Sequence, residues 1–196
     1  MNAYIYILIS IVFIVLLTKW YIFERRKYYI RKYTFSLKVM QDFKNTYPAL
    51  KDEEIKLIAQ ALLDYFKIIN IVGKKFVAMP SQSVGTFWKV FTNDNNEYQK
   101  FCKKSFGRYL VYSEAEGIQK NSIASDGIQL VWEHSCLNEG IDPDYPTKIP
   151  MLFNLDSKLK IEKGFYYTKS NKRLNKSLNE YCIFNIVNMK RTQVDK

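Results

Sequence analysis

The sequence predicts a mainly α-helical protein, in which one N-terminal transmembrane helix precedes a compact helical domain that ends in a short β hairpin. An unbroken apolar run opens the chain, with Ile, Leu, Val or Phe at eleven of the fourteen residues 4–17. Apolar residues then recur at spacings of three and four, which is the helical period. Residues 158–162 instead alternate between polar and apolar, which is the period of a strand.

Residues 1–23 are the predicted membrane anchor. Residues 3–18 are just long enough to cross a hydrocarbon core of about 30 Å at about 1.5 Å per residue, and the aromatic residues that follow extend the span into the interface. No basic residue precedes the apolar run and no A-x-A cleavage site follows it, so an uncleaved anchor is favoured. A signal peptide and a buried core helix are the two alternatives.

A basic juxtamembrane segment, residues 24–34, follows the anchor. Six basic residues lie between Lys19 and Lys32 with only Glu24 to oppose them, whereas the other flank of the apolar run has none. The positive-inside rule therefore predicts a cytoplasmic domain on a single-pass protein. Each of these bases contributes about 1 kcal/mol of attraction to an anionic leaflet, so membrane lipid is the expected partner. The predicted membrane-interface residues are Lys19, Trp20, Tyr21, Arg25, Arg26, Lys27, Arg31 and Lys32.

The helical domain is expected to cover residues 35–168 and to begin with two helices. Apolar spacing marks a helix over residues 37–46, which either stands alone or continues the membrane helix without a break. A longer helix over residues 52–70 has Asp52 as its cap and Gly73 as its stop. Acidic residues in its first turn suit the positive end of the helix dipole.

Three further helices are expected. Ser81 caps a helix that ends near Thr92, and Asp94 starts the next one, which ends at Gly107. These two short helices are predicted to pack as a hairpin around their aromatic residues. A fifth helix begins at about Ser125 or Asp126. Its predicted apolar face is made of Ile128, Val131, Trp132, Cys136 and Leu137.

The chain changes character after Gly140. Three prolines at positions 143, 146 and 150 exclude a regular helix through that stretch and predict an extended path across the surface. A strand over residues 158–162 and a second edge over residues 165–167, joined by a turn at Gly164, form the predicted hairpin. Residues 169–196 are a basic tail.

The net charge of +11 is concentrated at the two ends of the chain. The middle, residues 33–168, is nearly neutral, with 17 basic and 16 acidic residues. No aromatic-interleaved basic run or known binding motif accompanies the basic tail, so a nucleic-acid partner is disfavoured. The tail is expected to dock on the membrane surface or to remain solvated.

No catalytic, cofactor-binding or metal-binding set is recognisable in the sequence, and no cofactor is assigned. The single histidine, His134, forms no zinc spacing with the cysteines. Three cysteines without close spacing suit reduced, buried thiols of a cytosolic domain. These cysteines are Cys102, Cys136 and Cys182.

Paired carboxylates are the remaining candidates for acid–base chemistry. The candidate pairs are Glu53–Glu54, Glu114–Glu116 and Asp142–Asp144. The first pair is explained by the helix dipole, which favours acidic residues at a helix N-terminus, and the other two are explained by solvated loops.

A dense aromatic cluster is interpreted as core and, in the alternative, as the lining of a ligand pocket. The cluster comprises Phe87, Trp88, Phe91, Tyr98, Phe101, Phe106 and Tyr109.

Residues 79 to about 166 resemble an uncharacterised bacterial family with the pattern M-P-S, V-D-x-x-W-H-x-F, T-x-x-Y-x-x-F-C and F-G-x-x-L-H-H, followed by W, C, E and P-x-L-F. The chain is also remotely similar to the N-terminal part of plant glycine-rich-domain proteins. The matching residues are Met79-Pro80-Ser81, Val84, Trp88, Phe91, Thr92, Tyr98, Phe101-Cys102, Phe106-Gly107, Leu110, Trp132, Cys136, Glu139, Pro150-Met151-Leu152-Phe153, Asp156, Leu159 and Ile161. The resemblance implies a bacterial inner-membrane location.

The departures from this pattern fall on its polar positions. The Asp of the pattern falls on Gly85, its Trp-His pair reads Trp88-Lys89, and its paired histidines fall on Val111 and Tyr112. If relatives use those histidines for metal binding or proton transfer, the resemblance implies that this chain has kept the scaffold and lost the site.

The sequence therefore favours a non-enzymatic interaction or scaffold domain at the cytoplasmic face of the membrane, with an unidentified protein partner. The alternative is a metal-dependent or hydrolase-like enzyme that uses an unrecognised or degenerate site, with Glu139, Asp142 or His134 as its candidate residues. A nucleic-acid tether that uses the basic tail is a third hypothesis.

Overall fold

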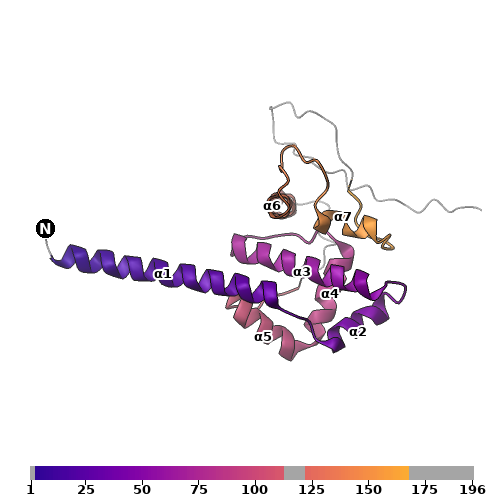
Figure 1. The fold of residues 1–196 in the computed structure, drawn as a ribbon, viewed down its shortest axis with the longest axis horizontal. Coiled ribbons are helices and arrows are strands. Elements are labelled where there is room, and N and C mark those ends of the chain that lie inside the picture. Colours follow the sequence, from indigo (N-terminus) through magenta and orange to yellow (C-terminus); the bar gives the residue numbers. More distant parts are fainter. Residues whose placement is uncertain (1–2, 113–121, 168–196) are drawn as a thin grey trace, which may run out of the picture.

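The computed structural model describes residues 3–112 and 122–167 of the chain. These ranges contain seven α-helices, and Figure 1 shows one of them projecting far beyond the rest. The mainly helical fold is therefore confirmed, as is a long apolar helix at the N-terminus. The helices are α1 (Ala3–Lys32), α2 (Leu37–Thr46), α3 (Asp52–Val72), α4 (Gln82–Asn93), α5 (Asn95–Phe106), α6 (Ser122–Asn138) and α7 (Met151–Lys158).

The helices in the first half of the domain begin and end at or near the residues predicted to cap them. The Ser81 hydroxyl accepts a hydrogen bond from the N–H of Val84 at the start of α4, and the Asp94 carboxylate accepts one from the N–H of Glu97 at the start of α5. Gly107 ends α5 in the left-handed conformation, with φ of +69°. The cap of α3 is Lys51 rather than Asp52, because the Glu54 carboxylate reaches back to the Lys51 N–H at 2.7 Å.

Helix α1 does not continue into α2. Helix α1 ends at Lys32, and α2 begins only at Leu37, after a short non-helical segment. Ser36 caps α2 by accepting a hydrogen bond from the N–H of Val39 at 3.4 Å, and Phe35 turns into the core. A cap and a buried ring at adjacent positions fix a bend where the uninterrupted alternative required a straight helix.

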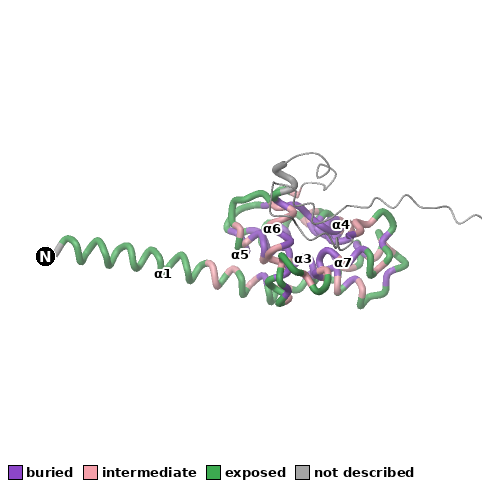
Figure 2. The backbone as a smooth tube through the Cα atoms, turned by 90° about the horizontal axis from the view of Figure 1, so that it is seen from above, coloured by how far each residue is buried: buried purple, intermediate pink, exposed green. Residues whose placement is uncertain are grey.

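Helix α3 lies at the centre of the domain and packs against α1, α2, α4, α6 and α7. Ten of its 21 residues are buried, and Phe66 and Tyr65 meet the Trp88 ring of α4. Figure 2 shows the buried segments gathered in the middle of the domain, whereas the projecting part of α1 is exposed along its length. One core therefore holds all the helices together.

The second half of the domain differs from the prediction. No strand occurs in residues 122–167: residues 151–158 form helix α7, and residues 159–163 form the turns that follow it, so the β hairpin is not supported there. The apparent alternation arises because Leu159 and Ile161 sit on either side of a turn against the core. Leu137 was expected on the buried face of α6, but it is 64% exposed, because the helix ends one residue later.

Candidate functional site: the anchor helix and a groove on the domain

Helix α1 has two parts with different surroundings. Residues 4–22 are exposed along the whole stretch, and burial begins at Phe23. These nineteen residues span about 28 Å at 1.5 Å per residue, which is close to the thickness of a hydrocarbon core. Within the described ranges, α1 is the one helix long and apolar enough to cross a membrane.

The predicted membrane-interface residues occupy the middle and the end of α1. Lys19, Trp20 and Tyr21 are exposed at the end of the apolar run, where a bilayer interface would lie. The amine of Lys27 lies 3.6 Å from the Glu24 carboxylate. The other predicted residues of this set, Arg25, Arg26, Arg31 and Lys32, lie on the last three turns of the helix.

The last two turns of α1 belong to the core of the domain. Ile30 is fully buried, and the Tyr29 and Tyr33 rings both pack against Phe101 of α5. The Tyr33 hydroxyl donates a 2.5 Å hydrogen bond to the Glu97 carboxylate. Burial and this carboxylate raise the pKa of Tyr33, so the hydroxyl keeps its proton and the bond persists across the physiological range. Helix α1 is therefore fastened to the domain by packing as well as by chain connectivity.

Helix α5 runs antiparallel to α1. The Arg26 guanidinium lies against Gly107, close enough to occupy the space that a Cβ would need there. The Lys104 amine lies over the Tyr29 ring, 5.4 Å from its centroid, and Glu97 bonds to Tyr33. Residues further along α1 therefore contact residues that come earlier in α5. The end of α5 faces the exposed part of α1, and its beginning faces away.

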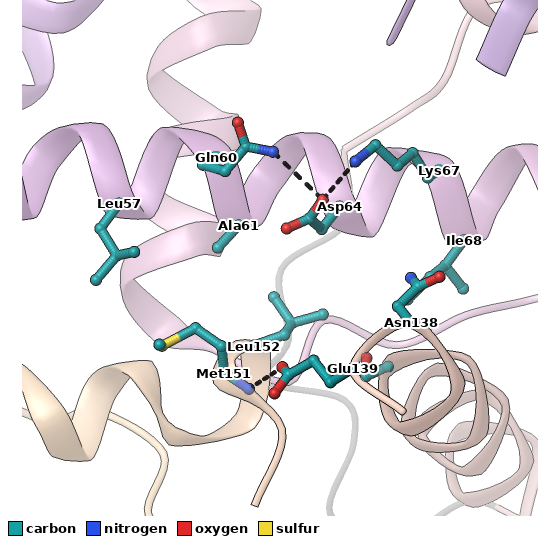
Figure 3. Close-up of a pocket in the computed structure, with 11 residues that line it drawn as sticks. Leu57, Gln60, Ala61, Asp64, Lys67, Ile68, Asn138, Glu139, Met151 and Leu152 are labelled. Atoms are coloured by element: carbon teal, nitrogen blue, oxygen red, sulfur yellow. Dashed lines mark hydrogen bonds and ion pairs between the residues drawn. The ribbon is translucent and has the colours of Figure 1, made fainter. Parts of the chain in front are cut away.

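A groove of about 250 Å³ lies between α3 and the elements around α6 and α7. Its lining mixes polar and apolar side chains and includes two carboxylates (Figure 3). Asp64 accepts hydrogen bonds from Gln60 at 3.3 Å and from Lys67 at 2.7 Å. Glu139 accepts one from the Met151 N–H at 2.5 Å. The lining residues are Leu57, Gln60, Ala61, Asp64, Lys67, Ile68, Ser135, Asn138, Glu139, Met151 and Leu152.

Ser135 is the unusual member of the groove lining. It is 5% exposed, and its hydroxyl has no hydrogen-bond partner among the described residues. Buried hydroxyls normally find a partner, because leaving one unpaired costs about 1–3 kcal/mol. Ser135 lies four residues before Glu139, which directly follows the end of α6. No sequence pattern singles out this serine.

The residues suggested for acid–base or metal chemistry do not converge. Glu53 pairs with Lys56 at 3.0 Å, and Asp142 accepts the backbone N–H groups of Asp144 and Tyr145 in a surface turn. Glu114 and Glu116 lie outside the described residues. Within residues 3–112 and 122–167, no three His, Cys, Asp or Glu side chains are grouped as a metal site would require.

Cys102 and Cys136 are buried free thiols in the described part of the chain, and Cys182 lies outside it. Burial raises the pKa of Cys102. Burial, followed by the Glu139 and Asp142 carboxylates, raises the pKa of Cys136 to about 11. Both thiols are protonated near neutral pH, which is the state of a structural rather than a reactive cysteine.

The aromatic cluster is core except at one edge. Trp88 is 5% exposed and donates from its indole N–H to the Tyr98 hydroxyl at 2.9 Å, while Tyr109 is 49% exposed. Two positions at which the resemblance places lost polar residues lie close together: a Cβ on Gly85 would be 3.9 Å from the Tyr112 hydroxyl. The Tyr112 ring packs edge-on against Trp88.

Asp156 forms a buried hub that sequence patterns did not reveal. Its side chain is fully buried, and its Oδ1 accepts hydrogen bonds from the Ser81 hydroxyl at 2.8 Å and from the N–H and hydroxyl of Ser83 at 3.1 and 2.6 Å. Its Oδ2 accepts from the N–H groups of Gln82 at 2.6 Å and Phe165 at 2.9 Å. A carboxylate at the N-terminus of α4 is also favoured by the helix dipole. One side chain therefore joins α4, α7 and the segment after α7.

The comparisons with known proteins give one match. A family model described as UCP032817-like matches residues 25–186, which include the base of α1 and every other helix. The matched region excludes residues 1–24 and therefore most of the apolar run. No curated protein and no solved structure matches the chain.

Proposed function

This chain belongs to the UCP032817-like family, an uncharacterised family, and we propose that it is a single-pass membrane protein whose helical domain binds a protein partner at the cytoplasmic face. The observation that carries the proposal is the division of α1. Its exposed part has the length and composition of a membrane span, and its last turns are built into the core.

The same division supports a retained anchor over a cleaved signal sequence. A signal sequence is separated from the mature protein at small residues, whereas residues 16–20 read Leu-Leu-Thr-Lys-Trp and lie within one continuous helix. The mass of the chain purified from membranes tests this point. We expect the intact N-terminus and resistance to extraction at alkaline pH. A chain that begins near residue 20, or that is released by alkali, would refute the anchor.

The cytoplasmic placement rests on the basic residues that follow the apolar run, and the proposed location in a bacterial inner membrane rests on the family resemblance. Topology reporters fused to the C-terminus test it. We expect activity from a reporter that functions only in the cytoplasm and none from one that functions only after export. The opposite pattern would place the domain outside.

The groove between α3 and α6–α7 is the surface that we propose for the partner. A lining in which Leu57 and Met151 are partly exposed beside the charged Asp64 and Glu139 suits an amphipathic helix, which buries one apolar face and keeps polar residues at the edges. A photo-crosslinking residue at Gln60, used in native membranes, tests the surface directly. The matched control is Gln41, which is exposed on α2 and bonds only to Asn45 among its described contacts. We expect a discrete adduct from position 60 and none from position 41, and equal labelling would refute the groove.

The alternative of a metal-dependent or hydrolase-like enzyme is supported by one observation, the unpaired Ser135 hydroxyl four residues before Glu139 in the groove. Metal analysis of the full chain after dialysis tests the metal-dependent form. Stoichiometric metal that is lost in Glu139→Gln and kept in Asp142→Asn would favour the enzyme. We expect no stoichiometric metal in either the wild-type chain or the two variants.

A further inference from the structure

Acidic and basic residues lie at opposite ends of helices α3 and α5. No Asp or Glu occurs between Asp64 and Asp94 or between Glu97 and Glu114, and these two stretches contain the ends of α3 and α5. The beginnings of the same helices carry acidic residues instead. The exposed bases at the helix ends are Lys74, Lys75, Lys103, Lys104 and Arg108.

The basic ends of α3 and α5 lie side by side, at the same distance along α1. The Arg108 guanidinium donates a 2.8 Å hydrogen bond to the carbonyl of Gly73, so the segments that follow the two helices are in contact. Arg26 of α1 contacts Gly107, which places these helix ends beside Arg26. Figure 1 shows the end of α3 at the edge of the domain from which the exposed part of α1 projects.

The position of Arg26 on α1 fixes the distance of this edge from a membrane. Ile22 is the last residue of the exposed apolar stretch, and Arg26 lies four residues, or about 6 Å, beyond it. The headgroup layer on each side of a hydrocarbon core is about 5–8 Å thick. If residues 4–22 fill the core, Gly73 and Gly107 lie within the headgroup layer.

We propose that this edge of the domain, which we call the basic edge and which comprises Lys74, Lys75, Lys103, Lys104 and Arg108, binds the headgroups of anionic lipids. The inference rests on the proposed membrane anchor and extends it, because it assigns a lipid contact to the folded domain. Ile71, 40% exposed on the last turn of α3, adds an apolar side chain at the same edge. Each base near an anionic surface favours the contact about fivefold.

The contact also suits the helix dipoles. The C-terminal ends of α3 and α5 carry partial negative charge, which would repel anionic headgroups if it were bare. Lys103 and Lys104 in the last turn of α5, Lys74 and Lys75 after α3, and Arg108 on the Gly73 carbonyl offset that charge and leave a net positive surface. The orientation of the domain is then fixed by the anchor and by the basic edge together.

The test places a fluorescent probe at the basic edge of the full chain in lipid nanodiscs. The background is Cys182→Ser, because Cys102 and Cys136 are buried. The probe is attached at Ile71→Cys. The matched control is Asn96→Cys, which is exposed on α5 eleven residues, or about 16 Å, from Gly107. Quenchers carried on lipid headgroups report contact with the membrane surface.

We expect quenching at position 71 to exceed that at position 96 at least threefold in discs containing phosphatidylglycerol, and to fall in phosphatidylcholine discs or at high salt. The variant Lys74→Glu, Lys75→Glu, Arg108→Glu should abolish the difference. The control variant Lys158→Glu, Lys160→Glu, Lys163→Glu should retain it, because these exposed bases lie at the end of α7 and in the turns that follow it. Figure 1 shows this orange segment at the edge of the domain away from the exposed part of α1.

Equal quenching at positions 71 and 96, or equal loss from the two triple variants, would overturn the basic edge as a lipid contact. Retention of the chain in the discs after alkaline washing is measured on the same samples. A retained chain without the quenching difference refutes this inference alone. A chain that washes out refutes the anchor and, with it, the premise of the inference.

Discussion

Replacing Asp156 by asparagine removes one charge and one acceptor from a site in which every group bonded to the carboxylate acts as a donor. If the amide NH2 takes the place of Oδ2, it faces the backbone N–H groups of Gln82 and Phe165. If it takes the place of Oδ1, the hydroxyls of Ser81 and Ser83 can rotate to accept from it. The Ser83 N–H then still lacks an acceptor. At least one buried N–H is therefore unpaired in either orientation.

The expected loss of stability for Asp156→Asn is about 2–4 kcal/mol. One buried unpaired N–H costs about 1–3 kcal/mol, and the remaining bonds lose the strength that the carboxylate charge gave them. This is a large share of the roughly 5–15 kcal/mol that stabilises a typical domain. Urea unfolding of the full chain in detergent micelles measures the loss, since Trp88 and Trp132 are buried and report the domain by fluorescence.

The matched control for this experiment is Asp142→Asn. Asp142 also accepts two backbone N–H groups, but it is exposed, so water replaces any lost bond. We expect this variant to change the free energy of unfolding by less than about 0.5 kcal/mol. If Asp156→Asn loses less than about 1 kcal/mol, or no more than the control, the side chain is not the hub that its hydrogen bonds indicate.

Three further predictions follow from the geometry. Trp88→Ala should cost about 3–5 kcal/mol by removing a buried ring and the donor to Tyr98, and a loss below about 1 kcal/mol in urea unfolding would contradict its place in the core. Stability should fall as the pH rises from about 9 towards 11, because native Cys136 keeps its proton up to a pKa of about 11 while the unfolded thiol loses it earlier; Cys136→Ala should remove that part of the slope. Charge reversal at Arg25, Arg26 and Lys27 should invert or loosen membrane placement in topology-reporter assays, and an unchanged topology would rule out these residues as its determinant.

Local chemistry was enough to predict most of the first half of the domain. Ser81, Asp94 and Gly107 mark helix ends through bonds to residues three or four positions away, so their effect can be recognised in a short stretch of sequence. The helix over residues 37–46 was predicted from its apolar spacing, which is also a local signal. The alternative in which it continues the N-terminal apolar helix is wrong, because the burial of Phe35 is set by rings from other helices.

The structure of the second half of the domain depends on contacts between residues far apart in the sequence, so local patterns did not predict it. Pro150 was interpreted as a barrier to helix, but it is the N-cap of α7, where its missing N–H is no loss and its carbonyl accepts from Phe153 and Asn154. The segment after α7 is positioned by Asp156, which accepts from Phe165 and also from Ser81, Gln82 and Ser83, more than seventy residues earlier in the chain. The groove and the basic edge likewise join residues from separate helices. Their antiparallel arrangement is visible only after folding.

The burial of Ile30 beneath α3 and α5 has a consequence for the order in which the protein forms. Translation delivers α1 first, and its end stays unpacked until residue 101 has been made and Tyr29 and Tyr33 can meet Phe101. The core therefore cannot close before the chain has returned to its first helix. A protease that later cut beyond Lys32 would remove part of the core along with α1. The released fragment would be a target for degradation rather than a soluble second form of the protein.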